Sequence, residues 1–160
     1  MTGASDPLSG LAPLRDVIRA HGLSAEKSLG QNFLLDRNLT DKIVRAAGDL
    51  SGTDVIEIGP GPGGLTRSLV RSSARTVTAV EYDPRAVGAL QSLVTAAGQE
   101  RLRVIHGDAL RCHIPALAGR PAAIVANLPY NIATPLLIGW LRALRSDPTC
   151  LSGLTLMFQK

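Results

Sequence analysis

The sequence of 160 residues predicts a single α/β domain, built as a doubly wound parallel sheet with helices on both faces. Two observations carry this prediction. Short apolar runs typical of buried strands alternate with helical patterns over most of the chain, and glycine and proline gather at the turns between them. Such alternation favours parallel strands joined by right-handed crossovers.

Each predicted element has a local signal. Strands are expected at residues 54–58, 75–81, 102–106, 122–126 and 154–158, where Val, Ile, Leu, Ala and Thr predominate. Helices are expected at residues 14–21, 38–47, 65–71, 84–97 and 135–144, where apolar residues recur at helical spacing. Asn38 and Asp83 are the expected N-caps of the second and fourth helices, and Pro84 and Pro135 are the expected first helical residues. Residues 1–10 are turn formers and predict a loose tail.

Composition limits the function classes. The net charge of +4 and the pI of about 9.6 are compatible with an anionic partner, and arginines within residues 67–75, 101–120 and 142–145 could contact phosphates. A merely solvated surface is an equally good interpretation. Cys112 and Cys150 have neither CxxC spacing nor a histidine cluster beside them, so neither a disulfide framework nor a metal site is expected. The sequence shows no signal peptide or membrane span, which predicts a cytoplasmic protein.

The segment Asn127-Leu128-Pro129-Tyr130 follows the fourth predicted strand. Asn127 offers an acceptor oxygen, Pro129 has no N–H, and Tyr130 offers a ring on which a base could stack. This set of groups at a strand end suits a planar exocyclic amine whose nitrogen receives a transferred group. The alternative is an ordinary Asn-x-Pro turn after a strand.

A glycine-rich turn follows the first predicted strand, where ligands of such sheets bind. Gly59, Gly61 and Gly64 satisfy the GxGxxG pattern, which by itself does not distinguish NAD from another adenosine cofactor. Pro60 and Pro62 remove N–H donors that a pyrophosphate would use, so they favour a cofactor without phosphate, such as S-adenosylmethionine. A tight turn without a ligand is the remaining alternative.

Two further carboxylates follow strands. Glu81 ends the second strand and could accept hydrogen bonds from both ribose hydroxyls of an adenosine cofactor, whereas Asp83 suits a helix cap. Asp108 follows the third strand and could accept from the adenine amino group, or form an Asx turn.

Taken together, these motifs resemble those of the ribosomal RNA adenine dimethyltransferase family, in the same order along the chain. The matching segments are Gly30 to Leu34, Glu57 to Gly61, Gly107 to Leu110, Asn127 to Pro135 and Met157 to Lys160. The resemblance implies a class I, Rossmann-like methyltransferase fold and S-adenosylmethionine as methyl donor. Family members continue beyond the last residue into further strands and a C-terminal helical domain. The chain would then consist of a tail and first helix at residues 1–22 and the N-terminal part of the catalytic domain at residues 23–160, truncated after the fifth strand.

The resemblance also implies residue roles. Gln31, Asn32 and Leu34 would hold the methionine end of the cofactor, with Gly59 beneath it. The remaining implied cofactor residues are Gly61, Glu81, Asp108, Ala109 and Asn127. Leu128 and Pro129 would present carbonyl oxygen to the target amine, Tyr130 would stack on the target ring, and Asn127 would lie between donor and target. No metal is implied.

Leu128 matches the small-subunit branch of the family, which implies N6-dimethylation of two adjacent adenosines near the 3′ end of 16S rRNA in the immature small subunit, by a monomer. Three alternatives remain at this stage. The chain could be a 23S rRNA adenine methyltransferase, a weakly catalytic RNA-binding or ribosome-assembly factor of the same fold, or an NAD-dependent oxidoreductase that uses the glycine turn.

Overall fold

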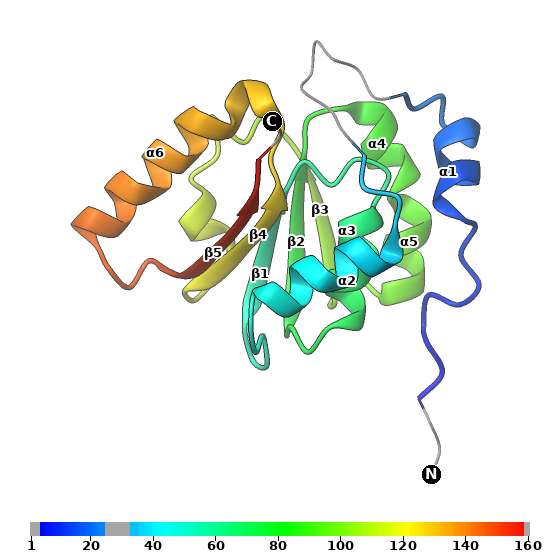
Figure 1. Ribbon diagram of the computed structural model, residues 1–160, viewed down its shortest axis with the longest axis horizontal. Helices are drawn as coiled ribbons and strands as arrows, with labels where there is room; N and C mark the ends of the chain where they lie inside the picture. The colour runs from blue at the N-terminus through cyan, green and yellow to red at the C-terminus, as the bar shows by residue number, and fades with distance from the viewer. Residues whose placement is uncertain (1–3, 25–32, 159–160) are drawn as a thin grey trace.

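The computed structural model describes residues 4–24 and 33–158. Within them, parallel strands form one sheet in the order β3-β2-β1-β4-β5 (Figure 1). The strands are β1 (Asp54–Ile58), β2 (Thr76–Glu81), β3 (Leu102–His106), β4 (Ala122–Asn127) and β5 (Leu151–Met157). The chain builds outward from β1 to β3 and then returns to place β4 on the other side of β1. Strand order therefore reverses between β1 and β4, which is where open α/β sheets bind ligands.

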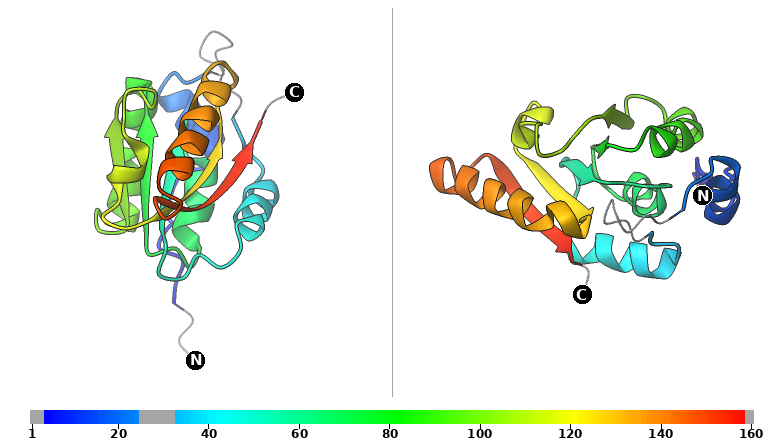
Figure 2. Two further views of the ribbon diagram at one scale, coloured as in Figure 1. Left: turned by 90° about the vertical axis from the view of Figure 1, so that its left-hand side faces the viewer. Right: turned by 90° about the horizontal axis from the view of Figure 1, so that it is seen from above.

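Helices cover both faces of the sheet, as the two views of Figure 2 show. One face is covered by α2 (Arg37–Ala46), α3 (Gly64–Arg71), α4 (Pro84–Ala89) and α5 (Gln91–Ala97). The other face is covered by α6 (Tyr130–Ser146) and by the short 3-10 helix η2 (Ile114–Leu117). The helix α1 (Leu14–Ala20) packs beside α4. The predicted doubly wound architecture is confirmed.

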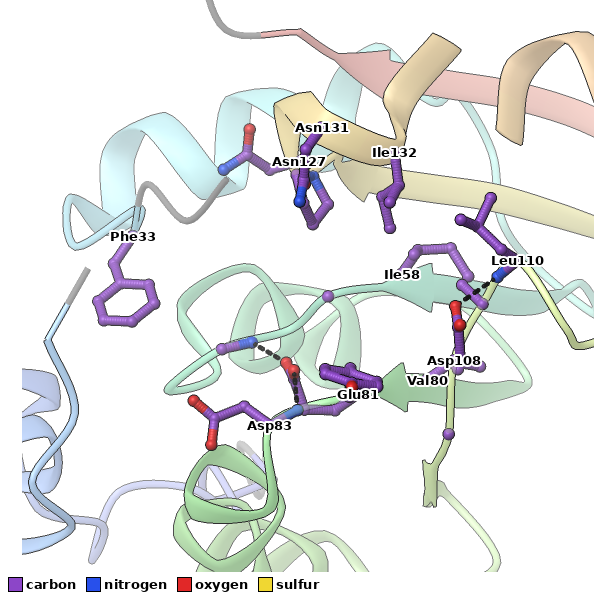
Figure 3. Close-up of a pocket in the computed structure, with 16 residues that line it drawn as sticks. Phe33, Ile58, Val80, Glu81, Asp83, Asp108, Leu110, Asn127, Asn131 and Ile132 are labelled. Carbon is purple, nitrogen blue, oxygen red and sulfur yellow. Dashed lines mark hydrogen bonds between the residues drawn. The ribbon is translucent and has the colours of Figure 1, made fainter. Parts of the chain in front are cut away.

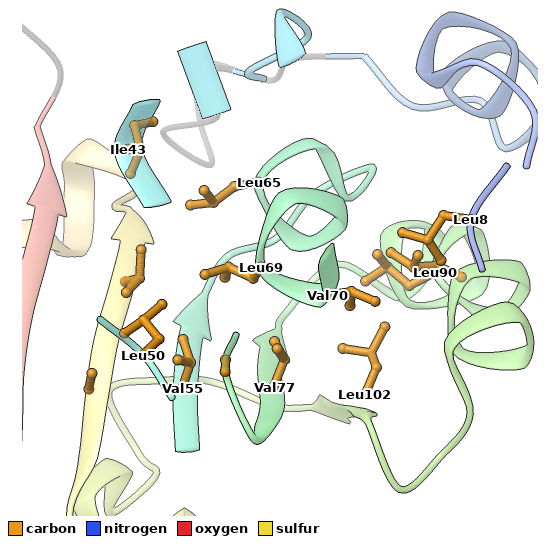
Figure 4. Close-up of a cluster of buried hydrophobic side chains, with 14 of the residues drawn as sticks. Leu8, Ile43, Leu50, Val55, Leu65, Leu69, Val70, Val77, Leu90 and Leu102 are labelled. Atoms are coloured by element: carbon orange, nitrogen blue, oxygen red, sulfur yellow. The ribbon is translucent and has the colours of Figure 1, made fainter. Parts of the chain in front are cut away.

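The strand residues divide between two apolar cores because successive side chains point to opposite faces. Val55 and Val77 contribute to the core beneath α2, α3 and α5, where Leu69 is fully buried (Figure 4). Ile56 and Ile124 contribute to the core beneath α6. Burying one such side chain stabilises the fold by about 1.5–3 kcal/mol, so both faces are fixed by hydrophobic burial.

Two helices differ from the sequence prediction. The helix expected at 135–144 begins at Tyr130 and contains Pro135 as its sixth residue. Proline has no N–H, so Pro135 cannot make the helical hydrogen bond to the carbonyl of Asn131. Because only this one bond near the amino end is lost, the helix continues. The helix expected at 84–97 is two helices, because Leu90 adopts φ −79° and ψ −10° between α4 and α5.

Smaller differences concern element ends. Asp36, not Asn38, caps α2, since its carboxylate accepts the N–H of Asn38 at 2.8 Å. β5 begins at Leu151, three residues earlier than expected. The prediction of a loose tail is wrong from Asp6 onward. Asp6 pairs with Arg71 of α3 at 2.9 Å, so this part of the tail is joined to the domain.

Candidate active site

The turns after β1 and β4 meet in one crevice at the carboxyl edge of the sheet. A Cβ atom added to Gly59 would lie 3.1 Å from Cγ of Pro129, so the two turns are in close contact. Ile58 and Val80 form apolar walls of the crevice, and Asn127 and Asp108 bring polar groups to it (Figure 3). The glycine turn and the Asn127 segment therefore share one site, as their positions after neighbouring strands predict.

The backbone donors of the glycine turn are already used within the protein. The N–H of Gly59 donates to the carbonyl of Val80, and that of Gly63 donates to the carbonyl of Pro60. The N–H of Gly61 donates to the carboxylate of Glu81 at 2.9 Å. Since residues 60 and 62 are prolines, residues 59–63 have no N–H left for a pyrophosphate. The turn therefore argues against a dinucleotide cofactor.

Glu81 ties the turn to the end of β2. One carboxylate oxygen accepts the N–H of Gly61, and the other accepts the N–H of Asp83 at 2.9 Å (Figure 3). Burial raises the pKa of Glu81, although the hydrogen bonds from Asp83 and Gly61 oppose this effect. The carboxylate lines the crevice and is held in one orientation, which suits an acceptor for ribose hydroxyls.

Glu57 is a second buried acid, on β1 directly before the turn. Its side chain is only 2% exposed and accepts a hydrogen bond from the hydroxyl of Thr66 on α3 at 2.6 Å. Burial raises its pKa to about 8, and the nearby charge of Glu81 adds to the effect. Glu57 is therefore mostly a neutral acid at pH 7. Of these two acids, Glu81 lines the crevice, and its carboxylate is the one that can disfavour an anionic ligand.

The other two acids have the roles that their positions suggest. Asp83 accepts the N–H of Arg85 at 2.9 Å and caps α4, where Pro84 is the first residue, as predicted. Asp108 accepts the N–H of Leu110 at 3.0 Å, which is an Asx turn, and also lines the crevice. The Asx turn is therefore present, and contact of Asp108 with the adenine amino group stays a prediction.

The segment after β4 places its side chains in different directions. Asn127 and Pro129 line the crevice. Leu128 is fully buried beneath α6, and its N–H donates to the carbonyl of Met157 at 3.1 Å. Tyr130 begins α6 and is 54% exposed. The segment is thus anchored through Leu128 while its neighbours remain accessible to a ligand.

Three predicted cofactor residues come from the segment before α2. Gln31 and Asn32 lie outside the described residues. Leu34 does not line this crevice: it borders a second cleft between α1, α2 and α3, and its carbonyl oxygen lies against Gly64. Ala109 and Gly61 line the crevice, and their contact with a cofactor stays a prediction.

Several crevice residues were not assigned from the sequence. They include Phe33, Tyr82, Leu110, Asn131 and Ile132. Each lies within a few residues of a residue that was assigned, so proximity to the motifs was the available signal. For Phe33, Leu110 and Ile132 the residue type gave no signal, because apolar side chains in such positions are equally typical of a core.

Residues 4–24 and 33–158 contain no group of three or more His, Cys, Asp or Glu side chains that could hold a metal ion. No helix in the same ranges is both long and apolar enough to cross a bilayer.

Comparisons with known proteins agree on one family. A sequence profile described as Ribosomal RNA adenine dimethylase matches residues 22–160. The chain is 60% identical over 153 residues to the ribosomal RNA small subunit methyltransferase A of Paracoccus denitrificans, covering 96% of this chain and 54% of that protein. The chain thus spans about half the length of the curated relatives it matches.

Two solved structures are similar over most of the chain. A dimethyladenosine transferase from Plasmodium falciparum matches with a TM-score of 0.65 and 31% identity, over 81% of this chain and 44% of that one. The 23S rRNA methyltransferase ErmE matches with a TM-score of 0.58 and 34% identity, over 68% of this chain and 42% of that one.

Proposed function

Because the chain belongs to the ribosomal RNA adenine dimethylase family and has the class I methyltransferase fold, we propose that it forms the cofactor-binding part of an rRNA adenine-N6 dimethyltransferase. The methyl donor is S-adenosylmethionine. The substrate is a pair of adjacent adenosines near the 3′ end of 16S rRNA in the maturing small subunit, in the cytoplasm. The observation that carries this proposal is the shared crevice of Gly59 and Pro129, which brings donor and acceptor segments together.

The cofactor fits the residues that line the crevice. S-adenosylmethionine supplies an activated methyl group on a sulfonium ion and carries no phosphate. The occupied N–H groups of residues 59–63 and the carboxylate of Glu81 in the crevice are compatible with such a ligand. Glu81 would hold the ribose and Asp108 the adenine, with Gly59 and Gly61 allowing close approach.

The Asn127 segment would position the target amine. Acceptor oxygens of Asn127 and of the Leu128–Pro129 backbone would hold the amine hydrogens, so that the nitrogen lone pair points away from the ring plane. Tyr130 would stack on the purine. Such a site requires no general base, because orientation and electrostatic complementarity supply most of the catalytic effect and the proton leaves after transfer.

The RNA would also contact arginines near the crevice. The second cleft is lined by Arg15 and Arg67 and by Arg37 and Arg71, which pair with Asp41 and Asp6. The cleft adjoins the segment that contributes Phe33 to the crevice. Guanidinium groups suit phosphate oxygens, so this face supports an RNA substrate.

Two measurements test the proposal. Calorimetry should show binding of S-adenosylmethionine and no binding of NAD. Labelled S-adenosylmethionine should transfer its methyl group to adenosine in small-subunit precursor RNA, and Asn127→Ala should abolish transfer while RNA binding changes little. Retained RNA binding without any transfer by the unmodified protein would instead favour a non-catalytic assembly factor.

A further inference from the structure

We propose that Phe33 is a positioning residue of the cofactor crevice, and that α1 holds its ring in place. The inference rests on the proposed function, since it concerns the same crevice. The match to the family profile begins at residue 22, after the end of α1 at Ala20. Phe33 links α1 to the crevice, because it packs on the same cluster as α1 and also lies against Gly61.

The ring of Phe33 lies against the glycine turn. A Cβ atom on Gly61 would lie 3.2 Å from both Cδ1 and Cε1 of the ring. The ring therefore occupies the space that a side chain at residue 61 would need. The N–H of Gly61 donates to Glu81. Figure 3 shows Phe33 on the far side of the turn from Glu81, so the turn is held between the ring and the carboxylate.

Phe33 also belongs to an apolar cluster that includes a residue of α1. Phe33 packs against a small apolar cluster of Val17, Leu23, Ala86 and Ala89, which joins α1 to α4. This cluster is separate from the two cores of the sheet. A guanidinium nitrogen of Arg85 also donates to the carbonyl of Gly22 at 3.3 Å, which ties the end of α1 to the start of α4.

This arrangement makes cofactor affinity depend on residues that do not line the crevice. Val17 is buried and supports the cluster on which Phe33 packs. Removing its methyl groups leaves a void in that cluster, and the ring can then move away from Gly61. The turn loses one of its two supports, and the residues that face the cofactor become less ordered.

The test compares two valines by calorimetry and thermal unfolding of the whole chain. Val17→Ala is expected to weaken S-adenosylmethionine binding roughly threefold to tenfold, a typical effect for a residue coupled to a site. Val70→Ala is the matched control, because Val70 is equally buried but belongs to the main core at the far end of α3. It should lower the melting temperature similarly and leave affinity within about twofold. Val17→Ile, which keeps a large apolar side chain in the cluster, should bind S-adenosylmethionine with the affinity of the unmodified protein.

A second variant keeps the inference testable if Val17→Ala does not fold. Phe33→Leu retains an apolar side chain but not the ring, and it should weaken binding at least as much as Val17→Ala. Unchanged affinity in whichever of these two variants folds would overturn the inference while leaving the proposed function intact. Failure of the unmodified protein to bind S-adenosylmethionine would instead refute the proposed function.

Discussion

Gly59, directly after β1, lies against the ring of Pro129, the second residue after β4. A Cβ atom added to the glycine would be only 3.1 Å from Cγ of the proline. Both residues line the crevice, and their contact sets the spacing between the glycine turn and the Asn127 segment. Any side chain at residue 59 must displace Pro129 or the turn itself.

Gly59→Ala should therefore impair the site more than the fold. Its φ of +69° costs an alanine about 1–2 kcal/mol, and the methyl group also meets Pro129. Gly52→Ala is the control, because Gly52 has a φ of +68° with no atom within 4 Å of the added carbon. Both variants should lose stability to backbone strain, and Gly59→Ala should lose more because of its contact with Pro129. Only Gly59→Ala should lose S-adenosylmethionine affinity, by about tenfold or more. Equal affinity in both variants would contradict a role for this contact.

The sequence predicted the order of elements and the place of the site well. β1 and β3 have the predicted bounds, and the crevice lies at the predicted strand ends. These features depend on local periodicity and on glycines whose positive φ is a local requirement, as at Gly59 and Gly61.

The missed features depend on contacts between distant residues. Pro135 suggested a helix start, but α6 extends to Tyr130 because Ala133 and Leu136 pack on the sheet. The raised pKa of Glu57 follows from burial beneath α3, which a strand pattern alone does not reveal. Phe33 similarly acquires its place only when α1 and α4 come together.

Glu57→Gln should change how stability depends on pH. The folded-state pKa of about 8 exceeds the usual 4.5, so the folded protein holds the proton more tightly than the unfolded chain. The stability that this proton confers is complete below pH 4.5 and is lost as pH rises through about 8. Between pH 6 and 9 the unmodified protein should therefore lose roughly 2–3 kcal/mol of unfolding free energy from this group.

The glutamine variant keeps an acceptor for the Thr66 hydroxyl and has no proton to lose. Its unfolding free energy should fall less over the same pH interval. The remaining decrease should include a contribution from Glu81, whose pKa is also raised. Denaturant unfolding at several pH values measures the difference. Glu100→Gln is the control, because Glu100 is exposed. If the unfolding free energies of Glu57→Gln and of the unmodified protein change in parallel with pH, the raised pKa of Glu57 is refuted.

Glu81→Gln should weaken both the turn and cofactor binding. The carboxylate accepts two backbone N–H groups, from Gly61 and Asp83, whereas an amide has a single acceptor oxygen and turns its NH₂ toward one of the donors. The unsatisfied donor should cost about 1–3 kcal/mol of stability. The S-adenosylmethionine dissociation constant should rise about tenfold or more, since the ribose also loses a charged acceptor. Glu100→Gln again serves as the exposed control, and an affinity equal to that of the control would exclude a ribose role for Glu81.

Tyr130 offers a test of target recognition that is separable from cofactor binding. Its ring is 54% exposed at the start of α6 and does not line the crevice, so Tyr130→Ala should alter neither stability nor S-adenosylmethionine affinity by more than about twofold. Loss of base stacking should lower single-turnover methyl transfer to precursor RNA by about tenfold, because a stacked base contributes about 1–3 kcal/mol. Tyr130→Phe keeps the ring and should retain most of the transfer rate. If the alanine and phenylalanine variants transfer methyl groups equally well, the target base does not stack on this residue, and the ring that holds it must be sought elsewhere.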